Sequence, residues 1–284
     1  MDKTSSKNMA IEHEFAYSDQ DFESLRKLVK EHTGINLSEH KQEMLYSRLA
    51  RRLRALKMDS FASYYKMLKR NPGDELIQFV NAVTTNLTAF FREPHHFHFL
   101  EKKLLPELIA RKSHSKRLRV WSAGCASGEE PYSLAMVLRE KMPLDWDIKI
   151  LATDLDSSMI ERGKQGVYTS DRIEGISDAR IKKWFKKGSG IHEGKVQIAA
   201  ELQSMVTFKS LNLMHNWPMH GPIDIIFCRN VVIYFDKPTQ RVLFDRFANL
   251  MDKNGCLFVG HSENLFQLST RYQLLQQTVY RRIS

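Results

Sequence analysis

The feature that most constrains the fold is a change of hydrophobic pattern near Arg117. From there the chain alternates short apolar runs with amphipathic segments of helical period. Such alternation is typical of a parallel sheet whose strands are joined by crossover helices. The pattern therefore predicts an α/β domain, with strands at Leu118–Ser122, Lys149–Thr153, Val206–Ser210, Ile223–Cys228, Cys256–Gly260 and Thr278–Arg282.

The stretch from Gly166 to Leu202 interrupts this alternation. It is polar, it is broken by Gly188-Ser189-Gly190 and Gly194, and it places Val196 and Ile198 two residues apart, as in a strand. Glycine-containing turns beside alternating residues are typical of hairpins. We expect a small antiparallel β insertion at about residues 166–202.

The first 90 or so residues predict helices. Ser18-Asp19-Gln20-Asp21 resembles a capping box, and Phe22, Leu25 and Val29 recur at helical spacing after it. Gly34 suits the left-handed conformation that ends a helix. Three further helices are predicted: one after Ser38 that runs to about Leu56, one at Ser60–Arg70 and one at Glu75–Thr85.

The second of these helices carries a basic face beside its apolar stripe. At 3.6 residues per turn one narrow arc holds four leucines, Leu45, Leu49, Leu53 and Leu56. The arc next to it holds four cations, Lys41, Arg48, Arg51 and Arg52. On its own, this pattern is best explained as a solvated helix face.

Composition limits the class of protein. A chain of 284 residues with 42% hydrophobic side chains can bury a substantial core. No stretch approaches the roughly 18 to 20 apolar residues of a membrane span, and no apolar run follows the first residues as in a signal peptide. Cys125, Cys228 and Cys256 are too far apart in sequence to suggest a disulfide framework or a zinc site. We expect a soluble, cytoplasmic protein without a resident metal.

The net charge of +10 favours an acidic partner. Charge alone does not distinguish nucleic acid, anionic lipid and an acidic protein surface.

A turn of small residues follows the first predicted strand, in the segment Val120–Pro131. Small side chains there allow a ligand to approach the backbone, and Asp154, at the end of the next strand, can accept hydrogen bonds from ribose hydroxyls. The turn lacks G-x-G-x-x-G and a P-loop lysine, and Glu129 and Glu130 would repel phosphate but suit an ammonium or sulfonium. A nucleoside ligand of that kind is one interpretation; tight helix–sheet packing is the other.

Five motifs, in order and spread over nearly the whole chain, resemble the chemotaxis receptor methyltransferases, the CheR family. They are Thr84–Glu93, Ser127–Ser133, Ala152–Asp156, Phe227–Phe235 and Gly260–Glu263. One departure is Gly124-Cys125, where some members carry alanines, and we expect it to leave cofactor binding intact.

The resemblance implies an all-α N-terminal domain with its linker (residues 1–88), followed by a Rossmann-like S-adenosylmethionine methyltransferase domain (residues 89–284) that carries the β insertion. It further implies methyl transfer from S-adenosylmethionine to receptor glutamates, which yields methyl esters and S-adenosylhomocysteine.

The resemblance also assigns roles to individual residues. Asn86, Thr88 and Arg92 would close over the methionine part of the cofactor, Glu130 (and also Glu129) would hold its amino group, and Asp154 its ribose. Asn212, Leu213, Asn230 and Val231 would line the adenine and methyl-transfer side. Arg92 and Tyr234 would flank the methyl group and act in catalysis, although Arg92 could instead form a structural ion pair with Glu93 or another neighbour.

The partners implied are cytoplasmic domains of methyl-accepting chemotaxis receptors, without nucleic acid or membrane insertion. Receptor segments in this pathway are acidic helical hairpins, so the basic face would dock them through Arg48, Arg51, Arg52 and Arg54.

Two other signals favour ordinary structural roles. His95, His96 and His98 have no cysteine or acidic partner at metal-ligand spacing, so packing and surface histidines are expected. His261-Ser262-Glu263 resembles part of a hydrolase triad, but no G-x-S-x-G elbow exists, and we reject hydrolysis.

Two alternatives to receptor methylation remain at this stage. Positive charge permits an RNA methyltransferase, although Arg229–Tyr234 lacks the Asn/Asp-Pro-Pro-Tyr array typical of amine methylation. The other is an S-adenosylmethionine-sensing adaptor without turnover, because fold alone does not establish activity.

Overall fold

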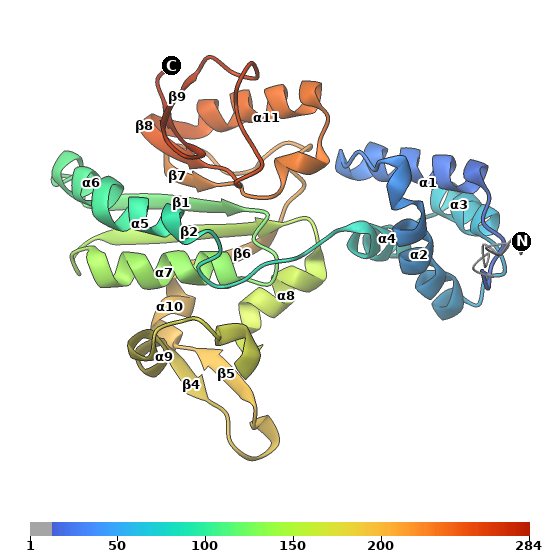
Figure 1. The fold of residues 1–284 in the computed structure, drawn as a ribbon, viewed down its shortest axis with the longest axis horizontal. Coiled ribbons are helices and arrows are strands. Elements are labelled where there is room, and N and C mark those ends of the chain that lie inside the picture. Colours follow the sequence, from blue (N-terminus) through green and yellow to red (C-terminus); the bar gives the residue numbers. More distant parts are fainter. Residues whose placement is uncertain (1–12) are drawn as a thin grey trace, which may run out of the picture. The chain divides into compact units, whose positions relative to one another are not determined.

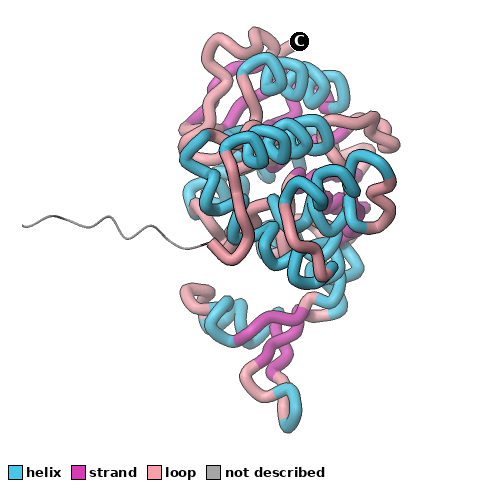
Figure 2. Tube along the Cα trace, turned by 90° about the vertical axis from the view of Figure 1, so that its right-hand side faces the viewer, coloured by secondary structure: helices cyan, strands magenta, loops and turns pink. Residues whose placement is uncertain are grey.

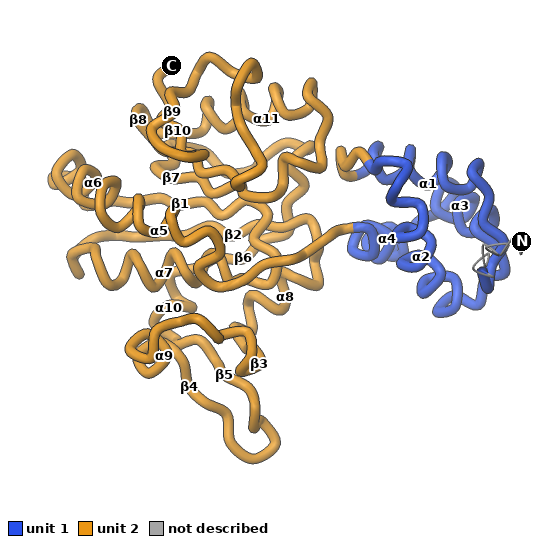
Figure 3. The backbone as a smooth tube through the Cα atoms, viewed as in Figure 1, with its two compact units in different colours: residues 1–32, 37–83 blue, residues 33–36, 84–284 orange. Residues whose placement is uncertain are grey.

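The computed structural model describes residues 13–284 and separates two compact units (Figure 3). The described part of unit 1 consists of residues 13–32 and 37–83, and unit 2 consists of residues 33–36 and 84–284. Among the described residues, no helix is both long and apolar enough to cross a bilayer.

Unit 1 is helical, as its sequence pattern predicts. Its four α-helices are α1 (Asp19–Thr33), α2 (Gln42–Leu56), α3 (Phe61–Arg70) and α4 (Glu75–Val83), with a 3-10 turn at Glu39–Lys41. The predicted capping box forms, because the Asp21 amide donates to Ser18 Oγ at 3.1 Å and the Ser18 amide to Asp21 Oδ2 at 3.0 Å. Gly34 adopts the expected positive φ of 75°. Three of the four leucines in the apolar arc of α2 are buried, and Leu56 is partly exposed.

The arginines of α2 have different surroundings within unit 1. Arg48 donates to the carbonyls of Ala82 and Val83 at the end of α4 (3.4 and 2.9 Å). Arg52 forms a two-point pair with Glu75 (2.9 and 2.5 Å). The exposed Arg54 pairs with Glu14 at 2.7 Å. Arg51 is exposed and makes no hydrogen bond or ion pair within residues 13–284.

Unit 2 is built on a seven-stranded sheet with the order β6-β2-β1-β7-β8-β10-β9. The ladders that join β6, β2, β1, β7 and β8 are parallel, and β10 is antiparallel to both β8 and β9. The strands are β1 (Arg117–Ala123), β2 (Asp147–Asp154), β6 (Val206–Ser210), β7 (Ile223–Phe227), β8 (Met251–Phe258), β9 (Tyr272–Gln276) and β10 (Val279–Arg282). This arrangement confirms the predicted Rossmann-like class.

Helices connect most of these strands (Figure 1). Before the sheet, α5 (Pro94–Phe99) continues through a π-helical turn (Leu100–Leu104) into α6 (Leu105–Arg111). The crossovers contain α7 (Glu129–Lys141), α8 (Ser157–Gln165), α10 (Ala200–Met205) and α11 (Lys237–Leu250). The central strands are buried on both faces, with Trp121, Ile225 and Phe227 fully inaccessible, as expected for a sheet covered by helices.

Two strand predictions need correction. Strand β9 was not predicted, because it is an edge strand whose Leu274 is 57% exposed, and its residues lack a clear apolar run. Strand β8 covers Met251–Phe258 instead of Cys256–Gly260, since pairing with β7 begins at Met251. Gly260 consequently lies in the loop after the strand.

The expected insertion forms a separate three-stranded antiparallel sheet, β3-β5-β4 (Figures 1 and 2). It contains β3 (Val167–Thr169), a 3-10 turn (Ser170–Ile173), α9 (Asp178–Trp184), β4 (Phe185–Lys187), a second 3-10 turn (Gly190–His192) and β5 (Lys195–Ile198). Val196 and Ile198 are both buried, as their alternation predicts.

Candidate active site

A cavity of about 930 Å³, open mouth included, lies within unit 2. Its walls come from the carboxyl ends of β1, β2 and β7, where the strand order reverses, and this crevice is the usual ligand site of open α/β sheets. The lining includes Arg92 and Tyr234, and every residue predicted for the cofactor except Glu129: Asn86, Thr88, Glu130, Asp154, Asn212, Leu213, Asn230 and Val231.

The turn after β1 brings backbone to the wall of this cavity. The amides of Gly124 and Cys125 both donate to the Thr153 carbonyl (2.8 and 2.9 Å), so the turn is attached to the end of β2. Gly124 has a φ of 88°, and a Cβ there would lie 2.3 Å from Val231 Cγ2. The glycine thus lets the turn after β1 approach the loop after β7.

Asp154 is buried at the cavity wall. Its Oδ2 accepts from the Ala126 amide at 2.8 Å and its Oδ1 from the Asp156 amide at 2.9 Å. Burial raises the pKa of Asp154 to about 6, although these backbone donors favour the carboxylate. The group is therefore ionised at neutral pH and protonates in mild acid.

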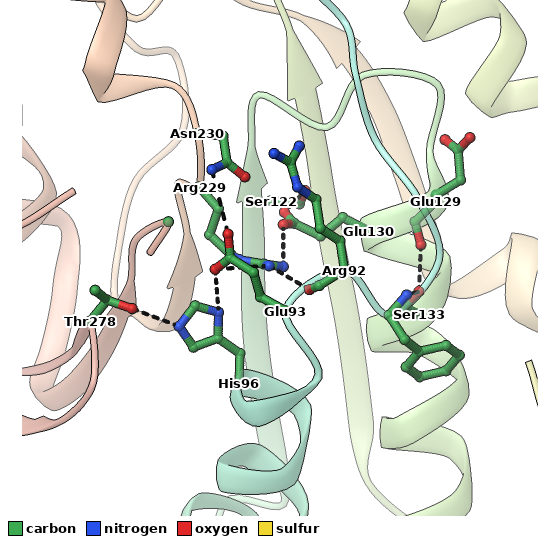
Figure 4. A network of polar contacts seen from close by, with 12 residues as sticks. Arg92, Glu93, His96, Ser122, Glu129, Glu130, Ser133, Arg229, Asn230 and Thr278 are labelled. Atoms are coloured by element: carbon green, nitrogen blue, oxygen red, sulfur yellow. Dashed lines mark hydrogen bonds and ion pairs between the residues drawn. The ribbon is translucent and has the colours of Figure 1, made fainter. Parts of the chain in front are cut away.

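Glu130 and Arg229 form a buried ion pair beside the same cavity (Figure 4). Glu130 Oε2 lies 3.1 Å from Arg229 Nη1, and Glu130 Oε1 accepts from Ser122 Oγ at 2.7 Å. Arg229 Nη2 is also 3.3 Å from Glu93 Oε2 and donates to the carbonyl of Arg92. Arg229 lies within the motif Phe227–Phe235, but the family resemblance assigned it no role.

The segment 84–88 is held by a second carboxylate. Asp156 Oδ2 accepts from Thr84 Oγ1 at 3.0 Å and from Asn86 Nδ2 at 2.6 Å, while Asp156 Oδ1 caps α8 through the Ser158 amide. The Asn86 amide nitrogen is thus engaged by protein, even though the residue lines the cavity. The signal that could have identified Asp156 is an N-cap aspartate two residues after Asp154.

Arg92 and Tyr234 both line the cavity. Arg92 Nη1 donates to the Leu87 carbonyl at 2.6 Å, and within the described chain no carboxylate pairs with Arg92. The alternative ion pair with Glu93 is therefore absent. The Tyr234 hydroxyl makes no hydrogen bond with any described residue, which leaves it available to a ligand.

Glu263 holds the loop that carries Asn230, Val231 and Tyr234. The buried carboxylate accepts from the amides of Asn230 (2.9 Å), Ile233 (3.1 Å) and Gly260 (2.6 Å). Asn230 itself has a φ of 57°. The last motif, Gly260–Glu263, thus positions a cavity wall and forms no triad, and His261 is engaged elsewhere, with Glu93 at 2.9 Å.

Glu129 is the one predicted cofactor residue that does not reach the cavity. Its side chain is 1% exposed, it pairs with Arg172 of the insertion, and Glu129 Oε2 accepts from Ser127 Oγ at 2.7 Å. Arg172 Nη2 also donates to the Thr88 carbonyl at 2.9 Å. The carboxylate therefore braces the turn after β1 against the insertion, since successive residues at the start of α7 point in different directions.

The histidine cluster has an acidic neighbour that sequence reasoning missed. Ligand atoms of Glu93, His95 and His96 lie within 4.8 Å of one another. However, Arg229 and His261 already engage the Glu93 carboxylate and hold the pKa of Glu93 at about 2 in spite of burial. Burial and the Arg229 charge lower the pKa of His96 to about 3. A guanidinium at this position repels a metal ion, so the cluster is better explained as part of the buried polar network.

Two family models match successive parts of the chain. A family model described as "CheR methyltransferase, all-alpha domain" matches residues 20–84, and one described as "CheR methyltransferase, SAM binding domain" matches residues 86–281. The chain is 45% identical over 270 residues to chemotaxis protein methyltransferase 2 of Pseudomonas aeruginosa, with 94% of each protein covered. It is 43% identical to the chemotaxis protein methyltransferase of Salmonella typhimurium, covering 93% of this chain and 91% of that protein.

Proposed function

The chain belongs to the CheR methyltransferase family, and from that premise we propose that it methylates glutamate side chains of methyl-accepting chemotaxis receptors. It is an S-adenosylmethionine-dependent methyltransferase of chemotaxis. The single observation that best supports the proposed acceptor is that Arg92, with donors beyond the one used on Leu87, and Tyr234 line one cavity, and that no histidine or lysine is among the described residues that line it.

The cavity residues suit S-adenosylmethionine, which carries an ammonium and a sulfonium. Two carboxylates, Glu130 and Asp154, supply the opposite charge. In the proposed arrangement Glu130 holds the amino group and Asp154 accepts hydrogen bonds from the ribose hydroxyls. Asn86, Thr88 and Arg92 lie beside the methionine part, and Asn212, Leu213, Asn230 and Val231 beside the adenine.

The proposed reaction needs alignment and no base. A glutamate acceptor has an unperturbed pKa of about 4.3, so at neutral pH it is already a carboxylate nucleophile. When bound, S-adenosylmethionine supplies an electrophilic methyl group. The acceptor oxygen forms a bond to the methyl carbon while the carbon–sulfur bond breaks and its electron pair stays on sulfur. A methyl ester and S-adenosylhomocysteine result, and no proton moves.

Arg92 and Tyr234 are proposed to orient the acceptor carboxylate. The Tyr234 hydroxyl has a free donor, and Arg92 keeps donors beyond the one used on Leu87. Both groups favour the carboxylate form and hold its oxygen in line with the carbon–sulfur bond. Positioning within a partly dry cavity would also weaken hydration of the nucleophile.

The test of the proposed function is transfer of radiolabelled methyl to membranes that contain chemoreceptors, followed by mild alkali. We expect label on receptor glutamates that alkali releases as methanol, because esters hydrolyse under these conditions. Alkali-stable label would instead indicate N-methylation and support the RNA or amine alternative. Absence of label on receptors, despite cofactor binding, would contradict the proposed acceptor.

Tyr234→Phe should lower kcat about ten- to a hundredfold while the Kd for S-adenosylmethionine changes little, because the hydroxyl acts on the acceptor. Single-turnover transfer and calorimetric binding measure the two quantities. Tyr65→Phe, on α3, is the matched control, because Tyr65 is not among the residues that line the cavity, and it should behave as wild type. Equal losses in transfer and cofactor binding would reject the proposed role.

The sequence proposes four arginines for the receptor-docking face, and their contacts in the structure leave two of them as candidates. Arg48 and Arg52 serve the packing of α2 against α4, through two carbonyls and through Glu75, which also accepts from Tyr64 at 2.7 Å. Arg51 is exposed, and the exposed Arg54–Glu14 pair can be exchanged at little cost. We therefore propose Arg51 and Arg54 as the cations that meet an acidic receptor helix.

Arg51→Ala should weaken binding of a receptor cytoplasmic fragment about two- to fivefold at low salt, with a smaller effect at high salt, because exposed charges are screened. Arg52→Ala should instead lower the free energy of unfolding of unit 1 by about 1–3 kcal/mol, since Glu75 loses its partly buried partner. All four tryptophans lie in unit 2, so tryptophan fluorescence would not report the unfolding of unit 1. Far-ultraviolet circular dichroism detects the loss of its helices and is the suitable probe. Unchanged fragment affinity of Arg51→Ala at low salt would refute the docking face.

Cofactor affinity should fall as pH decreases through about 6, the pKa of Asp154. Protonation converts the acceptor for ribose hydroxyls into a neutral acid, so affinity at pH 5 should be about tenfold weaker than at pH 7. Calorimetric titration with S-adenosylmethionine across this range measures the change. Asp154→Asn should bind weakly at both pH values and lack the step near pH 6. A wild-type affinity that stays constant down to pH 5 would contradict the assignment.

A further inference from the structure

Arg229 is the most buried of the charged residues that line the cavity. It lies two residues after the end of β7, its side chain is 2% exposed, and its guanidinium lies between the carboxylates of Glu130 at 3.1 Å and Glu93 at 3.3 Å (Figure 4). Glu130 opens to the cavity, whereas Glu93 does not line it. The guanidinium is thus a buried cation shared by one cavity-facing carboxylate and one structural carboxylate.

The same guanidinium links three segments of unit 2. It contacts the first turn of α7 through Glu130, the loop before α5 through Glu93 and the Arg92 carbonyl, and the end of β7 through Phe227. The rings of Phe97 and Phe227 lie 5.9 and 5.8 Å from its Cζ. Arg229 therefore restrains both Glu130 and the backbone that carries Arg92.

Burial alone would favour neutral Glu130. Burial raises the pKa of Glu130, and the Arg229 charge and the Ser122 hydrogen bond oppose that rise. Of the other titratable groups near the pair, His261 contacts Glu93 at 2.9 Å and forms no ion pair with Glu130 among the described residues. Glu93 is negative, His96 is held neutral by burial and Arg229, and burial raises the pKa values of the thiols of Cys125 and Cys228. Within the described chain, Arg229 is accordingly the cation that directly contacts Glu130.

We propose that Arg229 is a positioning residue that keeps Glu130 ionised and directed toward the cavity, so that the carboxylate can bind the ammonium group of the co-substrate. The inference rests on the proposed role of Glu130. In this scheme Arg229 does not act on the reacting methyl group. It acts through Glu130 and through the placement of Arg92.

The test compares the affinity of wild type and Arg229→Gln for S-adenosylmethionine between pH 6.5 and 8.5. Without the guanidinium, Glu130 should take up a proton in this range, so the variant should bind at least about tenfold more weakly at pH 6.5. The ratio of wild-type affinity to variant affinity should decrease toward one as pH rises. The ratio is used because titration of the ligand's own amino group affects both proteins equally.

Arg229→Lys is the matched control, because its ammonium retains a charge near Glu130 and should keep the ratio nearly independent of pH. If Arg229→Gln fails to fold by circular dichroism, Arg229→Gln combined with Glu93→Gln removes the second buried carboxylate and should show the same decrease of the ratio toward one. A weaker but pH-independent affinity in a folded variant would mean a purely structural role and overturn the proposal. Unfolding of both variants would overturn it as well, since the arginine would then be required for the fold itself.

Glu130→Gln separates this inference from the proposed function. Weakened cofactor binding in Glu130→Gln together with a pH-independent ratio for Arg229→Gln would reject only the role of Arg229. Normal cofactor binding in Glu130→Gln would reject the role of Glu130 itself, whatever Arg229→Gln does.

Discussion

The Arg229 guanidinium lies between Glu130 and Glu93 where almost no solvent reaches it, and the geometry of the cavity depends on that contact. Without this cation, burial would favour the neutral form of Glu130. With the cation present, the start of α7, the loop before α5 and the end of β7 are held at fixed separations. The ion pair with Arg229 also explains how the Glu130 carboxylate can lie at the cavity wall although much of its surroundings is apolar.

Buried carboxylates serve two purposes in this unit, and their partners distinguish them. The carboxylates of Glu263, Asp156 and Glu129 accept hydrogen bonds from backbone amides or bind side chains of neighbouring segments, and they hold loops in place. Asp154 and Glu130 also have protein partners, yet both reach the cavity wall. A carboxylate oxygen can accept more than one hydrogen bond, so these two groups can be fixed by the protein and still receive a ligand.

The arginines of α2, which contribute to the net charge of +10, differ in their surroundings. Within unit 1, Arg52 is held by Glu75 and Arg48 by the last carbonyls of α4, which complements the negative end of that helix. Arg51 faces solvent on the same helix. A helical wheel places these side chains in one arc, but only the packing of α2 against α4 determines which of them remain available to a partner.

The sequence by itself determined the α/β class, the helical N-terminal part, the β insertion and the family. These features follow from local periodicity and from motifs of fixed order, which act over neighbouring residues. The edge strand β9 lacked such a signal. The residues that the family resemblance assigned to the cofactor line the cavity with the exception of Glu129, and the catalytic and binding roles assigned to them stay predictions.

Only the tertiary structure decided which neighbours pair. Glu129 and Glu130 are adjacent in sequence, yet one meets Arg172 of the insertion and the other meets Arg229, 99 residues away. Glu93 reaches His261, 168 residues away, which local spacing could not indicate. Such contacts arise when parallel strands bring their carboxyl ends to one edge of the sheet. Sequence separation does not indicate which of these residues are in contact, so only the tertiary structure identifies the partner of each buried charge.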